Sequence, residues 1–181
     1  MNDLVMKRKF WPATLAHVFA AGVLMSAMSA GLVTKSFANA PLKEGMVAPA
    51  FSVPTLTGQD FNLELLKGKI VIVHFWATWC SGCRTEMPVL NHFYQSHHAK
   101  NVEMIGVSVD RPRDKKEVLR QAANFSFPLA LLNETKRNEF GSPDVLPLTY
   151  LIDGKGVIRK VFRADEGEVT AERLENAFQS K

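Results

Sequence analysis

Cys80 and Cys83 are the only cysteines in this 181-residue chain, and their spacing suits thiol-disulfide chemistry. The apolar residues 70–73 precede the pair and predict a strand that ends just before it. If a helix begins at Cys83, the sulfur of Cys80 lies at the helix N-terminus, where unpaired backbone N–H groups and the helix dipole stabilise a thiolate. Because the thiolate is the reactive form, the pattern predicts that Cys80 attacks and that Cys83 resolves the mixed disulfide.

Two other roles for the pair fit the sequence less well. A disulfide that serves stability alone is disfavoured, because so short a loop removes little entropy from the unfolded chain. A zinc site would have to recruit His92 and either His97 or His98. At about 100° per residue, His92 faces away from Cys83 on a helix, and the spacer is shorter than in a zinc finger. We therefore expect a redox dithiol without a metal or a cofactor.

Strands and helices alternate around the dithiol. Apolar runs predict the strands, and apolar residues at intervals of three and four predict the helices. The strand before the cysteines is continuously apolar, which is typical of a strand buried on both faces. The predicted strands cover residues 51–56, 61–63, 69–75, 102–109, 128–132, 148–152 and 157–162, and the predicted helices cover residues 83–97, 114–124, 134–140 and 169–178.

This order of elements predicts an α/β fold. Alternation followed by a hairpin indicates a three-layer domain with a single mixed central sheet, and residues 51–63 add an N-terminal β-hairpin extension. Pro88 lies inside the helix that begins at Cys83 and should kink it. No internal repeat or long linker divides the sequence after the N-terminal segment, so we expect one domain.

The N-terminal segment predicts export. Lys7, Arg8 and Lys9 precede a mostly apolar stretch that small residues follow. We expect cleavage after Ala38, which makes residues 1–38 a signal peptide and residues 39–181 the mature domain. The alternative is a signal anchor in the inner membrane, because residues 14–33 carry no charge over about the length of a membrane-spanning helix. Either outcome places the domain in the periplasm or another extracytoplasmic space.

The charge distribution argues against a nucleic-acid partner. The formal net charge is +4, but residues 1–38 hold four basic residues and one acidic residue, so the rest of the chain carries 4 − 3 = +1. A nucleic-acid-binding domain needs a basic face of its own. The folded domain is therefore not expected to bind nucleic acid.

The residues around the dithiol resemble the TlpA/ResA-like thiol-disulfide oxidoreductases of the thioredoxin superfamily. Residues 75–80, Phe-Trp-Ala-Thr-Trp-Cys, are nearly that family's signature, and residues 146–153 resemble the segment that carries its cis-proline. The resemblance runs from about Gly45 to the C-terminus and implies a thioredoxin fold. It also implies that Pro147 is cis and lies against the cysteines, although most X-Pro bonds are trans.

Two further polar residues are site candidates: the resemblance implies the first, and the second departs from the family pattern. Glu86 lies where these proteins often hold a partly buried acid that exchanges protons with Cys83, although a solvated glutamate at a helix start is the simpler reading. His74 lies six residues before Cys80, where thioredoxin has a buried acid and this family more often has asparagine. As a candidate proton relay, it would favour the thiolate if protonated, or accept a proton during resolution if neutral. The alternative is a core histidine with satisfied hydrogen bonds.

The resemblance also implies a surface that contacts the substrate. Trp79 should be partly exposed beside Cys80, and the backbone at Leu146 should pair with an extended substrate segment. Ser81 and Gly82 lie between the cysteines and line the turn. They should tune the reduction potential of the Cys80/Cys83 pair.

Together these features predict an exported thiol-disulfide oxidoreductase that reduces protein disulfides, with the cysteines of apocytochromes c among the substrates that the family implies. An oxidising compartment requires an electron source, so we expect a membrane thiol carrier to re-reduce the dithiol. The alternatives are a disulfide oxidant or isomerase of the same fold and a non-enzymatic binding module. A peroxide reductase is disfavoured, because Val73 and Ala77 stand where such proteins have proline and threonine or serine.

Overall fold

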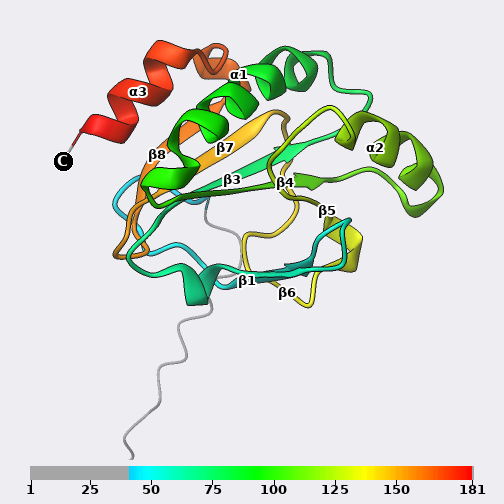
Figure 1. Cartoon of the computed structure of the whole chain (residues 1–181), viewed down its shortest axis with the longest axis horizontal. Helices are drawn as coiled ribbons and strands as arrows, with labels where there is room; N and C mark the ends of the chain where they lie inside the picture. Colours follow the sequence, from blue (N-terminus) through cyan, green and yellow to red (C-terminus); the bar gives the residue numbers. More distant parts are fainter. Residues whose placement is uncertain (1–40, 181) are drawn as a thin grey trace, which may run out of the picture. The chain divides into compact units, whose positions relative to one another are not determined.

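The computed structural model describes residues 41–180 (Figure 1). The predicted signal peptide and the possible anchor at residues 14–33 lie outside the described residues. The strands are β1 (Phe51–Pro54), β2 (Asp60–Asn62), β3 (Ile70–Trp76), β4 (Val102–Ser108), β5 (Leu129–Leu131), β6 (Arg137–Asn138), β7 (Leu148–Ile152) and β8 (Ile158–Arg163). The α-helices are α1 (Ser81–His97), α2 (Lys115–Ala122) and α3 (Ala171–Gln179), and short 3-10 turns cover Leu63–Leu66, His98–Lys100, Pro112–Asp114, Leu132–Glu134 and Ala164–Glu166.

The central sheet has five strands in the order β5-β4-β3-β7-β8. The β3–β4 and β4–β5 pairs are parallel, whereas the β3–β7 and β7–β8 pairs are antiparallel. This arrangement confirms the predicted mixed sheet and the predicted C-terminal hairpin. β3 is the middle strand, so its carboxyl end brings the dithiol to the centre of one sheet edge.

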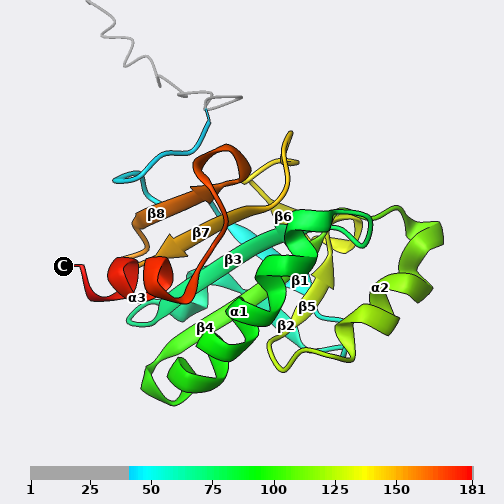
Figure 2. The same cartoon turned by 90° about the horizontal axis from the view of Figure 1, so that it is seen from above.

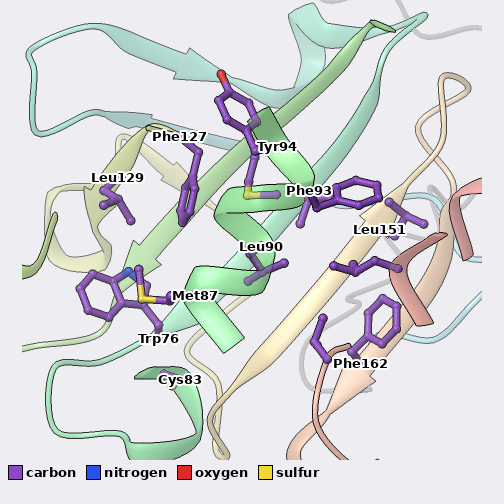
Figure 3. Packing of buried hydrophobic residues seen from close by; sticks show 14 of the residues in the cluster. Trp76, Cys83, Met87, Leu90, Phe93, Tyr94, Phe127, Leu129, Leu151 and Phe162 are labelled. Carbon is purple, nitrogen blue, oxygen red and sulfur yellow. The ribbon is translucent and has the colours of Figure 1, made fainter. Parts of the chain in front are cut away.

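Side chains of β3 alternate between two buried faces, as its continuous apolar sequence predicted. Ile72 and Trp76 pack with the inner faces of the helices, and Figure 3 shows Trp76 beside the α1 residue Met87. Val71 and Phe75 point to the opposite face and join a second apolar cluster. α1 and α3 lie side by side on the first face, and β1 and β6 lie across the second (Figures 1 and 2). The three predicted layers are present, and the third layer is a sheet.

That third layer is a separate antiparallel sheet with the order β2-β1-β6, where a single sheet was expected. The predicted hairpin supplies β1 and β2. The predicted helix at residues 134–140 is wrong, because Arg137 and Asn138 form β6 against β1. Backbone hydrogen bonds from Lys136 N–H to Ser52 O (2.9 Å) and from Glu139 N–H to Ala50 O (3.0 Å) flank this strand. The pairing joins segments far apart in sequence, so local periodicity does not reveal it.

Candidate active site

Cys80 and Cys83 form a disulfide at the start of α1, with their Cα atoms 5.3 Å apart. Cys80 is the N-cap residue, and its Sγ accepts a hydrogen bond from the Cys83 N–H at 3.1 Å. Cys83 is fully buried, whereas Cys80 is 7% exposed. No acidic residue lies in the first turn of α1, so nothing there offsets the positive end of the helix dipole. This position favours a thiolate on Cys80 once the disulfide is reduced.

Pro147 lies directly beside the dithiol turn. The Leu146–Pro147 peptide bond is cis, as the family resemblance implied. A Cβ atom on Gly82 would lie 3.3 Å from the Cδ of Pro147, so the glycine allows the turn and the proline to approach closely. Pro147 is buried and Leu146 is partly buried. The tertiary structure therefore brings Pro147 and the dithiol turn together, as the family resemblance implied.

Large apolar side chains are exposed in both segments that meet at the dithiol turn. Trp79 is 67% exposed and Val145, which precedes the cis-proline segment, is 61% exposed. Ser81 is also exposed. Large exposed apolar side chains next to a reactive group are typical of a surface that contacts another protein.

A cavity of about 760 Å³ opens next to Pro147. Its apolar wall includes the aromatic rings of Phe75, Phe140 and Tyr150, and Arg163 and Asp165 also line it. Burial raises the pKa of the Tyr150 phenol, and the nearby Arg163 guanidinium lowers it by less. This cavity has no signal in the sequence, because its walls come from segments that are distant along the chain.

Glu86 lies on the buried face of α1, one turn after Cys83, and is 2% exposed. Its Oε1 accepts a hydrogen bond from the Val169 N–H at 2.9 Å, which links α1 to the segment before α3. Burial raises the pKa of the Glu86 carboxyl; the Val169 hydrogen bond opposes this, Glu168 adds to it, and Arg173 lowers it. The carboxyl is buried beside the helix that carries the dithiol, and is not a solvated residue at a helix start.

His74 is fully buried on the face of β3 that α1 covers. Its Nδ1 lies 2.8 Å from the hydroxyl of Thr149 on β7, and its Nε2 has no hydrogen-bond partner among residues 41–180. Burial lowers the pKa of the imidazole to about 3. The ring is therefore neutral at pH 7. A charged imidazole beside the dithiol therefore does not fit this burial, and the same low pKa makes the neutral ring a weak proton acceptor at pH 7.

Asp110 is a buried carboxylate beside the dithiol loop that the sequence analysis missed. It is 3% exposed and accepts hydrogen bonds from both the backbone N–H and the hydroxyl of Thr78. A signal was present in the sequence, because Asp110 follows the predicted strand at residues 102–109. Parallel neighbouring strands bring the residues after their carboxyl ends to the same sheet edge.

Residues 41–180 contain neither a metal-binding cluster nor a membrane-spanning helix. Between residues 41 and 180, no group of three or more His, Cys, Asp or Glu residues could hold a metal ion. His92 is exposed whereas Cys83 is buried, in keeping with their predicted placement on opposite sides of α1. None of the helices in the same range is long and apolar enough to cross a membrane.

Comparisons with known proteins find the same fold and chemistry. Residues 45–161 match the AhpC/TSA family. A thiol-disulfide oxidoreductase ResA of Bacillus cereus is 37% identical over 136 residues, which cover 75% of this chain and 76% of that protein. The solved thioredoxin domain of a thiol-disulfide oxidoreductase from Bacteroides vulgatus is 30% identical, with a TM-score of 0.60 over 75% of this chain and 97% of that one. The solved structure of StoA from Bacillus subtilis is 27% identical, with a TM-score of 0.56 over 74% of this chain and 98% of that one. The predicted thioredoxin fold is confirmed.

Proposed function

Because this chain belongs to the AhpC/TSA family and is a thiol-disulfide oxidoreductase of the ResA/TlpA type, we propose that it reduces protein disulfides outside the cytoplasm. The observation that carries the proposal is the position of Cys80. Its sulfur caps a helix without acidic residues in the first turn, beside the cis-proline and the exposed Trp79. Such a site combines an activated thiol with a surface for a protein substrate.

In the proposed reaction, the Cys80 thiolate attacks one sulfur of a substrate disulfide. The substrate S–S bond breaks, a mixed disulfide forms, and the second substrate sulfur leaves as a thiolate that takes up a proton. Cys83 then loses its proton and attacks the Sγ of Cys80, which releases the remaining substrate sulfur as a thiol. The substrate gains two electrons, and the protein ends with the Cys80–Cys83 disulfide. The buried Cys83 cannot meet a large substrate first, which supports this division of roles.

The substrate is proposed to bind along the cis-proline segment. The backbone at Leu146 would pair with an extended strand of the substrate, and Trp79, Ser81 and Gly82 would contact residues next to its cysteine. The cavity beside Pro147 could take a side chain of the bound segment. Cysteines of apocytochromes c are the substrate class that we favour, and a membrane thiol carrier would return electrons to the dithiol by the same exchange chemistry.

The reduction potential of the Cys80/Cys83 couple tests the direction of the reaction. We expect a value below about −230 mV when residues 39–181 are equilibrated with defined thiol buffers. A value near −120 mV is typical of a strong oxidant and would contradict the reductase proposal. Retention of biological activity after both cysteines become serine would instead indicate a binding module.

Export rests on residues 1–38, where a basic start precedes an apolar stretch and small residues. We expect the mature protein, isolated from cells that express the full chain, to begin at Asn39. The intact mass of the isolated protein shows directly at which residue it begins. A membrane-bound protein of full-length mass would support the signal anchor at residues 14–33, and a soluble cytoplasmic protein of that mass would refute export.

Glu86 is proposed to take the proton from Cys83 in the resolving step. Only the carboxylate can accept it, and the pKa of Glu86 is raised above its ordinary value. The rate of resolution should therefore rise with pH through that raised pKa. Glu86→Gln should lack this rise and should resolve about 100-fold more slowly at neutral pH, with the two rates converging in acid. Rapid-quench measurement of mixed-disulfide decay from acid to neutral pH follows both proteins.

His74 is the second candidate acceptor, and the same measurement separates it from Glu86. His74→Asn can keep a hydrogen bond to Thr149 but cannot take up a proton. If Glu86 is the acceptor, the rate of resolution still rises with pH in His74→Asn. A rise that persists in Glu86→Gln and disappears in His74→Asn would assign the proton to the imidazole.

A further inference from the structure

We propose that Asp110 is a positioning residue for the attacking thiol, and that it acts through Thr78. Both oxygens of the Asp110 carboxylate accept hydrogen bonds from this one residue. The Thr78 hydroxyl donates to Oδ1 at 2.6 Å, and the Thr78 backbone N–H donates to Oδ2 at 2.9 Å. Thr78 is two residues before Cys80, so a contact that fixes Thr78 also limits where the sulfur can lie. The inference rests on the proposed role of Cys80 as the attacking thiol.

The turn that carries Cys80 contains a backbone N–H group that needs a hydrogen-bond acceptor from another part of the chain. The Cys80 N–H donates to Ala77 O at 3.1 Å, which closes a turn over residues 77–80. In such a turn the N–H of the second residue, here Thr78, has no partner within the turn. Asp110 supplies that partner. Without it, the Thr78 N–H would lack this acceptor, and Trp79 and Cys80 at the end of the turn would have a less defined position.

The sheet register sets this contact. Trp76 on β3 and Ser108 on β4 are paired at the carboxyl ends of the two parallel strands. Thr78 and Asp110 each follow by two residues, so they leave the sheet at the same level. The Val109 N–H still donates to Trp76 O at 2.9 Å, which keeps the two chains together beyond the strands.

Asp110 is itself held in place. The Ser108 hydroxyl donates to its Oδ2 at 2.8 Å, and the Asp110 N–H donates to the Ser108 Oγ at 3.1 Å. The residue is 3% exposed, and no Lys, Arg or His among residues 41–180 forms an ion pair with it. A buried carboxylate is costly unless donors satisfy it, and here two of its three donors come from Thr78.

Side chains from two helices donate hydrogen bonds to the carbonyl group of Thr78. Its carbonyl oxygen accepts hydrogen bonds from Arg84 Nη1 on α1 at 3.2 Å and from Gln121 Nε2 on α2 at 3.5 Å. The N–H, hydroxyl and carbonyl of Thr78 are therefore all occupied, by groups from the β4 edge, α1 and α2. This convergence on the residue before Trp79 and Cys80 is more than a turn needs to be stable, and it indicates control of the position of the thiol.

The test compares Thr78→Val, Thr78→Ser and Asp110→Asn in the reduced protein. Valine keeps the shape of threonine but removes the hydroxyl, and serine keeps the hydroxyl. We expect Thr78→Val and Asp110→Asn to slow the attack of Cys80 on a small-molecule disulfide by about tenfold to a hundredfold, because small misplacements of reacting groups cost this much. Thr78→Ser should restore a rate within about threefold of the wild type, since the hydrogen bond to Asp110 returns.

Thr55→Val is the matched control. It also removes a hydroxyl, one that accepts a hydrogen bond from Gln59 N–H at 3.1 Å in the loop between β1 and β2. It should lower the melting temperature without changing the rate of attack. The pH midpoint of Cys80 thiolate formation, followed by ultraviolet absorbance, gives a second readout, which should rise in Thr78→Val and keep the wild-type value in Thr55→Val.

The possible outcomes distinguish a positioning role of Asp110 from a purely structural role. If Thr78→Val and Asp110→Asn lower the melting temperature as Thr55→Val does but keep the wild-type rate and midpoint, Asp110 is a structural residue and the inference is wrong. Should Asp110→Asn fail to fold, Thr78→Val alone decides. If the wild-type reaction does not depend on Cys80, as Cys80→Ser would reveal, the proposed function fails instead.

Discussion

Cys83→Ser should remain covalently attached to its substrate after a single attack. Cys80 is at the helix N-terminus and can still form the mixed disulfide, but the buried thiol that would release the substrate is gone. Turnover should fall by at least about 10³-fold, since loss of a reacting group costs up to about 10⁶-fold in enzymes that depend on it. Non-reducing gel electrophoresis and mass spectrometry of the trapped species measure the result, and the trapped partners also identify the substrate class.

Cys80→Ser provides the matched control. It keeps Cys83 but lacks the attacking sulfur, so it should trap nothing. If Cys80→Ser traps partners and Cys83→Ser does not, the two roles are reversed. Equal trapping by both variants would mean that Cys83 is reachable in the reduced protein, contrary to its full burial in the disulfide form.

Phe51→Ala should destabilise the domain by about 3–5 kcal/mol, the usual range for removal of a buried phenylalanine. Phe51 on β1 is fully buried, and its ring contacts the rings of Phe61, Phe75 and Phe140 in edge-on arrangements. It therefore joins the three-stranded sheet to the central sheet. Urea denaturation of the wild type and the variant gives the difference in unfolding free energy.

Leu65→Ala is the control for this prediction. Leu65 is also a large apolar residue outside the central sheet, but it is 79% exposed. Its loss should change the free energy of unfolding by less than about 0.5 kcal/mol. A cost below about 1 kcal/mol for Phe51→Ala would contradict the conclusion that the small sheet is part of the core. A large cost without loss of disulfide exchange would show that this layer supports the fold rather than the reaction.

Much of the candidate site follows from short-range sequence patterns. Cys80 and Cys83 lie between an apolar run and a helical periodicity, so their place at a helix N-terminus could be predicted without a structure. Glu86 is one turn after Cys83, and the same periodicity places it on the buried face. The cis bond at Pro147 was predicted only through the family resemblance, because proline alone favours trans.

The pKa values of the buried polar groups required the tertiary structure. Sequence left His74 open between a charged, a neutral and a purely structural role. Its complete burial, which lowers the imidazole pKa to about 3, depends on the helices that cover β3. The raised pKa of Glu86 likewise comes mainly from its burial in the folded domain, to which Glu168 adds and which the Val169 hydrogen bond opposes.

The redox dithiol and most of the order of strands and helices around it can be predicted from the sequence, because each is encoded by neighbouring residues. Tertiary pairing produced the second sheet, where β6 pairs with β1 in a segment that was predicted to be a helix. It also decided the contact between Asp110 and Thr78, which joins the ends of two strands. Both features depend on hydrogen bonds between residues far apart in the chain, and such pairings depend on which strand edges meet after folding.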